Sequence, residues 1–286
     1  MTSSSMLAAA ALVALAMPSV AAAACDPYEV TVTQVSGLTY SPTDPLDTRI
    51  ALELRATATG LDADCVNLPV ILGPSAEDPR PLRLSNGQHD LQGRFPGSGN
   101  ATQALNRLVL TRPARALLVA NQPVRIDLSD VTRSQFVRAG DYTSELQLRV
   151  GDQREVFSVG STVLPTIVLL GASADGQEQI SLGDITQGGR GSARLFYRSN
   201  ADLRVGAVSD NGGFLVHAEG SAFGRVPYDA AYSGTPMNLT SGPFSRELSF
   251  SGTGIKSDIL TIEVPVTPDL FAGLYSDVIT LSFQPY

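Results

Sequence analysis

The chain has no tryptophan, two cysteines, two histidines and a single lysine among its 286 residues. Charged residues make up 17% and aromatic residues 6%, whereas hydrophobic residues make up 43%. This balance argues against a disordered chain and favours a folded, β-rich protein of about two domains. The net charge of −8 argues against nucleic acid or an anionic membrane surface as a partner, so we expect no nucleic-acid site.

Long hydrophobic runs are also scarce. One such run, MLAAAALVALAMPSV, lies near the N-terminus and is followed by the small residues AAAAC. The pattern predicts a signal peptide over residues 1–24, cleaved before Cys25. A lipoprotein site at Cys25 is the alternative. The segment MTSSSM before the apolar run lacks the basic residue that signal peptides usually carry there. The run is too short and too alanine-rich for a good membrane anchor, so the mature chain is expected to be exported.

The two cysteines, Cys25 and Cys65, lie 40 residues apart. In an oxidising compartment an even pair predicts one disulfide. A redox role is not favoured, because the sequence has no Cys-x-x-Cys motif.

Residues typical of catalysis are few. His89 and His217 fall in different halves of the chain, and GGRGS at residues 188–192 lacks the Lys-Ser/Thr ending of a phosphate loop. The DADC stretch ending at Cys65 lacks the spacing of further oxygen ligands that calcium requires. We therefore predict no enzyme, no catalytic residue, no metal and no cofactor.

Short runs of alternating apolar and polar residues dominate the rest of the chain. YEVTVTQV, RIALELRA, SARLFYRS and DILTIEVPV each show the period of two that is typical of strands. SDNGG predicts a turn between LRVGAV and FLVHA, and NATQALNRLVL is the one candidate for a short helical turn. The pattern predicts an all-β protein of immunoglobulin-like β-sandwich type.

An internal repeat divides the chain. AGDYTSELQLRV, Ala139 to Val150, matches AGLYSDVITLSF, Ala272 to Phe283, at a distance of 133 residues. The repeat predicts two sandwich domains, 25–164 and 165–286.

Each copy of the repeat contains one tyrosine that comes two residues after a glycine. Tyr142 and Tyr275 match the corner tyrosine near the start of the penultimate strand of such sandwiches. The alternative is that both are ordinary core tyrosines.

The two copies differ beyond the repeated strand. In the first copy REVFSVGSTV supplies a last strand, whereas the sequence ends at Tyr286 in the second. We therefore expect the second sandwich to lack its final strand and to receive one from another chain by β-augmentation. The expected groove has a wall from Ile167 and Leu169, or from Val168 and Leu170, and a floor from Tyr275, Ile279, Leu281 and Phe283.

GFLVHAEG, VPYDAAYSG and the ending Ala-Gly-x-Tyr-Ser-Asp resemble the spore coat protein U domain. That domain is similar to subunits of the archaic chaperone–usher pili of Gram-negative bacteria. The resemblance covers 165–286 well and the first copy loosely. It implies export through the periplasm to a surface pilus. The implied partners are a periplasmic pilus chaperone, an outer-membrane usher and a neighbouring pilin that supplies a donor strand.

In that family the two-domain member is the tip adhesin, with an adhesive N-terminal domain and a pilin-like C-terminal domain. The mature chain is expected to enter its first strand by Tyr28, with no spare donor strand, which favours the tip position and a role in surface attachment and biofilm formation. A minor or shaft subunit and a free secreted carbohydrate-binding module are the alternatives.

Three stretches of the first copy are candidate adhesive loops because apolar residues there lie beside turn formers. They are SPTDPL, LPVILGP and ARALLVANQP. The alternative is that the two apolar runs are core strands. The candidate contact residues are Leu46, Val70, Ile71, Leu72, Leu117, Leu118 and Val119.

Overall fold

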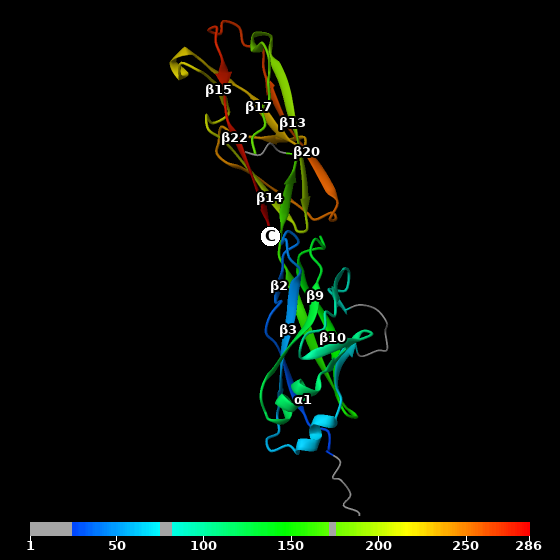
Figure 1. Cartoon of the computed structure of the whole chain (residues 1–286). Helices are drawn as coiled ribbons and strands as arrows, with labels where there is room; N and C mark the ends of the chain where they lie inside the picture. Colours follow the sequence, from blue (N-terminus) through cyan, green and yellow to red (C-terminus); the bar gives the residue numbers. More distant parts are fainter. Residues whose placement is uncertain (1–24, 75–81, 172–175) are drawn as a thin grey trace, which may run out of the picture.

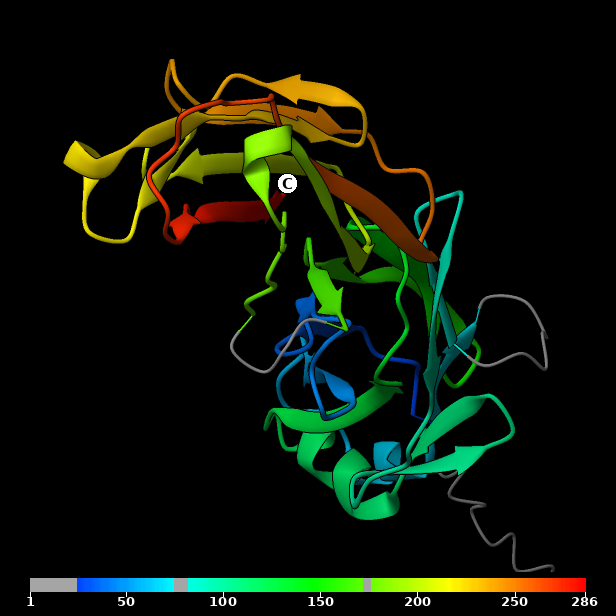
Figure 2. The same ribbon diagram turned by 90° about the horizontal axis from the view of Figure 1, so that it is seen from above.

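The computed structural model describes residues 25–74, 82–171 and 176–286, and the predicted signal peptide lies outside these ranges. Figure 1 shows two bodies of chain that meet at a narrow junction, and they remain separate in the view from above (Figure 2). We call residues 25–164 the N-terminal lobe and 165–286 the C-terminal lobe. Buried side chains form one hydrophobic cluster in each lobe. No helix among the described residues is long and apolar enough to cross a membrane.

Strands of the N-terminal lobe form one connected network in the order β1-β3-β9-β6-β5-β10-β4-β8-β7, and β11 pairs with both β10 and β2. Every pair is antiparallel except β11 with β2. The strands are β1 (Val30–Gln34), β2 (Thr39–Tyr40), β3 (Thr48–Ala56), β4 (Val70–Pro74), β5 (Leu82–Ser85), β6 (Asp90–Arg94), β7 (Ala101–Ala104), β8 (Arg107–Leu110), β9 (Val124–Val131), β10 (Gly140–Val150) and β11 (Gln153–Val163).

The described residues of the C-terminal lobe form three antiparallel sheets, in the orders β12-β13-β20-β17-β18, β19-β14-β22 and β16-β15-β21. This architecture confirms the prediction of an all-β protein with immunoglobulin-like sandwich character. The strands are β12 (Ile167–Leu170), β13 (Gly189–Ser199), β14 (Leu203–Ser209), β15 (Phe214–His217), β16 (Arg225–Pro227), β17 (Asp229–Tyr232), β18 (Thr235–Met237), β19 (Phe244–Leu248), β20 (Ile255–Val264), β21 (Tyr275–Ser276) and β22 (Ile279–Pro285). Two 3-10 turns accompany them, η2 (Ile185–Gln187) and η3 (Ser221–Phe223).

A disulfide joins Cys25 to Cys65, which confirms that prediction. Cys65 is buried in the 3-10 turn η1 (Ala63–Asn67). By the chain-entropy account, a crosslink over a loop of this length stabilises the folded state by roughly 3–4 kcal/mol.

The one α-helix among the described residues lies where the sequence did not indicate a helix. α1 (Arg112–Val119) has a proline in its first turn and buries Ala114 and Leu118, which are four residues apart and therefore share one face. Arg115 fixes the helix by donating from Nε to the Val66 carbonyl oxygen at 2.8 Å. The prediction of a helical turn in NATQALNRLVL is wrong, because β7 and β8 pair there as a hairpin that turns at Leu105.

The two lobes are held together by hydrogen bonds around Asn200, which is fully buried. Its side chain accepts from the Thr166 amide at 2.7 Å and donates to the Leu164 carbonyl at 3.0 Å. Its own carbonyl accepts from the Ala139 amide at 2.8 Å. The amide group of one side chain therefore binds both sides of Pro165, between the last strand of one lobe and the first strand of the next.

Candidate strand-acceptor groove

Among the described residues of the C-terminal lobe, each of the three sheets ends in two edge strands, and β12 and β22 are two of these six. β12 pairs with β13 only, and β22 pairs with β14 only. β22 runs back to the junction, where the chain end is marked in Figure 1. An unpaired edge exposes a row of backbone donors and acceptors that a further strand can satisfy.

The inner face of β22 is apolar but not fully covered. Ile279, Leu281 and Phe283 are half-buried, and they alternate with the exposed residues Thr280, Ser282 and Gln284. Phe283 packs against Tyr197 of β13 with ring centroids 5.9 Å apart. This alternation is typical of a strand whose one face belongs to a core, so part of that core is open to solvent.

Strand register decides which residues of β12 share that inner face. Ile167 pairs with Ser199 and Leu169 with Tyr197, and both β13 residues are buried. Directly paired residues of antiparallel strands point to the same side of the sheet, so Ile167 and Leu169, rather than Val168 and Leu170, face inward. Leu169 is nevertheless 51% exposed. Apolar side chains that face inward are thus partly exposed on both β12 and β22.

The strand after Tyr275 is interrupted, although the sequence predicts one continuous strand. β21 ends at Ser276 and β22 begins at Ile279. Asp277 occupies the break, and its carboxylate accepts hydrogen bonds from Ser209 Oγ at 2.6 Å, from the Asn211 amide at 3.0 Å and from the hydroxyl of Tyr228. The predicted SDNGG turn is therefore fixed to the start of β22 by this carboxylate.

Burial of the hydroxyl and its hydrogen bond to Asp277 raise the pKa of Tyr228 above its usual value. Tyr228 consequently remains a protonated donor to Asp277 at neutral pH.

Tyr275 lies in a different sheet from the other three expected floor residues. Its hydroxyl donates to the Phe271 carbonyl oxygen at 3.1 Å, and its ring meets His217 edge-on at 5.0 Å. His217 is buried with Nε2 at 3.2 Å from the Ala272 carbonyl oxygen. A Cβ at Gly273 would collide with this imidazole, which explains the glycine of the Ala-Gly-x-Tyr motif.

The adhesive-loop candidates are mostly not at exposed tips. Val70 and Leu72 are fully buried in β4, Leu118 is fully buried in α1, and Ile71 and Val119 are partly buried. These residues therefore build the core, because β4 lies between β10 and β8 and α1 packs on the first cluster. Leu46 is 75% exposed and Leu117 is 42% exposed.

The most exposed large apolar side chain in the described part of the N-terminal lobe is Leu105, at 90%. It is not among the expected contact residues, because a single leucine between Ala104 and Asn106 carries no periodic signal. Its exposure is evident only when the β7–β8 hairpin is known.

Known proteins match this chain in structure only. A scan against models of protein families finds no match, so the resemblance to the spore coat protein U domain is not confirmed. A search of curated proteins also finds no match. Solved structures do match, and they include subunits and adhesins of pili and fimbriae rather than enzymes.

One match is the CsuC–CsuE complex of a chaperone with a tip adhesion subunit from archaic chaperone–usher Csu pili of Acinetobacter baumannii. It shows 14% identity over 89% of this chain and 100% of that chain, with a TM-score of 0.44. The CfaE adhesin of enterotoxigenic Escherichia coli shows 10% identity over 90% of this chain and 81% of that chain, with a TM-score of 0.37. At such low identities and TM-scores, these likenesses do not by themselves assign a function to this chain.

Proposed function

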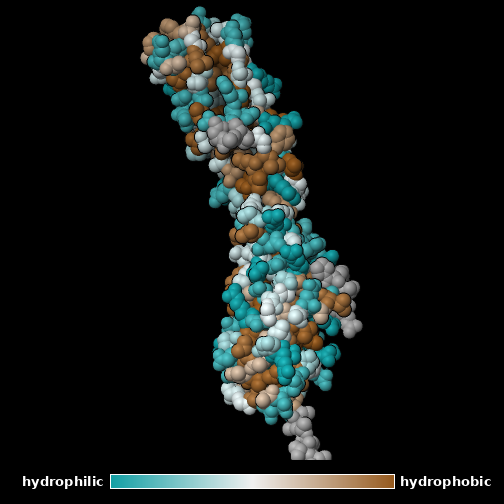
Figure 3. Space-filling view, in the orientation of Figure 1, coloured by the Kyte–Doolittle hydropathy of each residue, from teal (hydrophilic) through white to brown (hydrophobic). Residues whose placement is uncertain are grey.

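We propose that this chain is a subunit of a chaperone-assembled surface pilus and that its C-terminal lobe accepts a strand from another polypeptide. The observation that carries the proposal is the open core between β12 and β22. Leu169 on one wall and Leu281 and Phe283 on the other are apolar, face inward and are only partly covered. The sequence resemblance around the second copy of the repeat supports the same assignment. Hydrophobic surface is visible on the C-terminal lobe in Figure 3.

The N-terminal lobe indicates how the partner strand would lie. In that lobe β11 pairs antiparallel with β10 and parallel with β2. β22 corresponds to β10 in the repeat. We compare β12 with β2, because β12 is the first strand of the C-terminal lobe and β2 is an early strand of the N-terminal lobe. A donor in the equivalent position runs antiparallel to β22 and parallel to β12, and places alternate apolar residues over Leu281 and Phe283.

Within a pilus, the proposed position is the tip. The N-terminal lobe closes its own core, since β11 covers β10 along its whole length, and that lobe is free to contact a surface or host receptor in attachment and biofilm formation. A periplasmic pilus chaperone and an outer-membrane usher are the proposed assembly partners. The chaperone would cover the open apolar edge of the C-terminal lobe before assembly, because exposed strand edges of this kind promote aggregation.

The test is to supply the missing strand in cis. A copy of β11, Gln153–Val163, is added after Tyr286 through a two-residue turn like the one that joins β10 to β11. We expect the melting temperature of the C-terminal lobe to rise by several degrees, since one apolar strand is buried and one edge is paired. The matched control replaces the inward apolar residues of the added copy, those equivalent to Phe157, Val159 and Val163, with serine. Equal melting temperatures for the two fusions and the parent chain would show that no strand-acceptor groove exists.

A further inference from the structure

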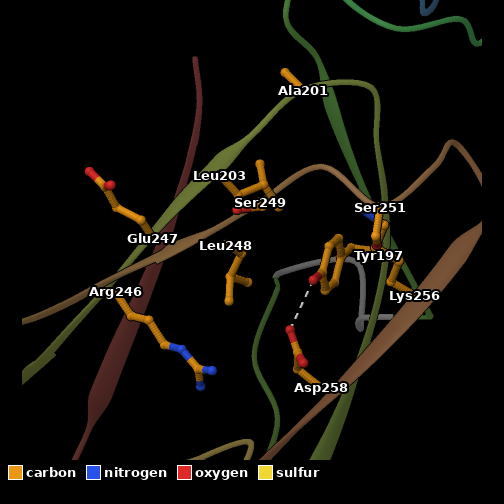
Figure 4. Close-up of a pocket in the computed structure, with 10 residues that line it drawn as sticks. All are labelled: Tyr197, Ala201, Leu203, Arg246, Glu247, Leu248, Ser249, Ser251, Lys256 and Asp258. Atoms are coloured by element: carbon orange, nitrogen blue, oxygen red, sulfur yellow. Dashed lines mark hydrogen bonds between the residues drawn. The ribbon is translucent and has the colours of Figure 1, made fainter.

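A second open space lies in the C-terminal lobe, beside the gap between β12 and β22. It is a cavity of about 390 Å³ between the sheet of β13 and β20 and the sheet of β14 and β19. Figure 4 shows the side chains that line it, with Tyr197 and Asp258 directed toward one another. Its size falls in the range of about 300–1,000 Å³ typical of small-molecule sites.

The inner face of β20 changes from apolar to charged along its length. Leu260, Ile262 and Val264 are buried, and the same face continues with the half-buried residues Lys256 and Asp258. The sandwich interior is therefore filled by hydrocarbon at one end and lined by charged groups at the other. β19 adds a further charge, because Arg246 lies on the same face as the half-buried Phe244 and Leu248.

The carboxylates that line this cavity already have donors. Asp258 accepts from the hydroxyls of Tyr197 at 2.9 Å, Tyr232 at 2.6 Å and Ser233 at 2.7 Å. Burial and this carboxylate raise the pKa of both tyrosines, so that they remain donors at neutral pH. Glu247 forms an ion pair with Arg204 at 3.0 Å.

The two lining cations are less well satisfied. Arg246 donates to the Tyr232 carbonyl oxygen at 3.2 Å, and the Lys256 ammonium lies 5.3 Å from the centre of the Phe250 ring. Within the described part of the chain, neither has a carboxylate at ion-pair distance. Arg138 of the N-terminal lobe lies 5.2 Å from the same Phe250 ring and adds positive charge nearby. A partly desolvated cation without a counter-ion favours binding of an anion.

We propose that this cavity binds a small organic carboxylate of the size of an acidic monosaccharide, with Arg246 and Lys256 holding the carboxylate. Ser249 and Ser251, which also line the cavity, supply hydroxyls for hydrogen bonds to the remainder of the ligand. The Tyr197 ring provides an apolar wall for it. None of the lining residues belongs to β12 or β22, but the cavity adjoins the proposed groove, because Tyr197 packs against Phe283 and pairs with Leu169.

Lys256 provides a specific probe, because it is the only lysine of the chain. The mature full-length protein is treated with an amine-reactive reagent, and the labelling rate of Lys256 is followed by peptide mass spectrometry. We expect glucuronate to slow labelling at least fivefold and glucose, which lacks the carboxylate, to leave it unchanged. Equal labelling rates with and without glucuronate, or equal protection by glucose, would overturn the proposal.

Variants then test the two cations by calorimetric titration with glucuronate. Arg246→Gln and Lys256→Gln should each weaken binding at least tenfold. Arg194→Gln, at an exposed position of β13 on the opposite face from Tyr197, is the matched control and should bind normally. Should Arg246→Gln fail to fold, Lys256→Gln decides the result. Unchanged affinity in a folded variant of either cation would exclude the proposed contacts.

Discussion

β10 and β22 carry equivalent apolar positions of one sequence repeat, yet they differ in burial. Leu146, Leu148 and Val150 of β10 are 0–3% exposed. Their counterparts in β22, Ile279, Leu281 and Phe283, are only partly buried. The side chains are of similar type, so their chemistry does not explain the difference. The cause is the neighbouring strand, since β11 pairs with β10 along its full length and no described strand pairs with the corresponding edge of β22.

Other features of the repeat are the same in both lobes. Tyr142 donates to the Arg138 carbonyl oxygen at 2.7 Å, and Tyr275 donates to the Phe271 carbonyl oxygen at 3.1 Å. In each case the acceptor lies four residues before the tyrosine, as expected of a tyrosine corner. The tyrosine corner is therefore present in both copies, although β10 is one continuous strand and its counterpart is divided into β21 and β22.

The largest expected effect is a difference between β10 and β22 in how much their inward side chains stabilise the chain alone. Leu148→Ala removes a fully buried side chain and should lower the free energy of unfolding of the chain alone by about 2–5 kcal/mol. Leu281→Ala or Phe283→Ala should change the chain alone much less, and should instead weaken binding of a donor strand by roughly 30-fold or more. Chemical denaturation measures the first effect, and the dissociation rate of a donor peptide measures the second.

The control for this comparison is Ser282→Ala, on the outer, exposed face of β22. It should leave donor binding intact. Loss of donor binding in Ser282→Ala with normal binding in Leu281→Ala would show that the inward register is wrong.

The disulfide gives a second difference between the lobes. Replacing Cys25 and Cys65 with alanine should lower the stability of the N-terminal lobe by roughly 3–4 kcal/mol through the gain in unfolded-state entropy. The C-terminal lobe has no cysteine and should melt at an unchanged temperature. Calorimetry of the variant and of the oxidised parent chain provides the measurement, and a parallel loss in both lobes would mean that they unfold as one unit.

Asn200 tests whether the lobes are independent. Asn200→Ala removes two hydrogen bonds around Pro165. It leaves the Thr166 amide without its acceptor, whereas the Leu164 carbonyl oxygen keeps a donor in the Thr166 hydroxyl at 3.1 Å. The loss should cost roughly 1–3 kcal/mol. We expect a broader distribution of distances between the lobes, measured by electron paramagnetic resonance on a spin label in each lobe. Asn200→Asp keeps the acceptor for the Thr166 amide but loses the donor to the Leu164 carbonyl and buries a charge, so it should broaden the distribution as well. An unchanged distribution in the alanine variant would show that Asn200 does not fix the junction.

The smallest expected effects come from the corner tyrosines. Tyr142→Phe should lower stability by about 1 kcal/mol, because the tyrosine is fully buried and the Arg138 carbonyl loses its donor. Tyr275→Phe should cost less, since its hydroxyl is more exposed to water. Melting temperatures of the two variants can be compared directly. A larger loss from Tyr275→Phe would contradict the difference in burial.

Much of the fold was predictable because its determinants are local. Alternation in RIALELRA and REVFSVGSTV specifies strands by period, and the match between residues 139–150 and 272–283 identifies equivalent strands. The helix α1 was not predictable in the same way. Its apolar run resembles a strand, and only the packing of Ala114 and Leu118 on the core selects the helical form.

The residues of the candidate groove also divide into those that the sequence assigns and those that only the tertiary structure assigns. The sequence by itself determined which residues of β22 face inward. A strand has two faces, and Ile279, Leu281 and Phe283 make one of them apolar. It left Ile167 and Leu169 undistinguished from Val168 and Leu170, because all four residues are apolar. Only the tertiary structure decided between them, through the pairing of Leu169 with Tyr197. It also decided that Asp277 interrupts the strand, because the donors to that carboxylate come from residues far away in sequence.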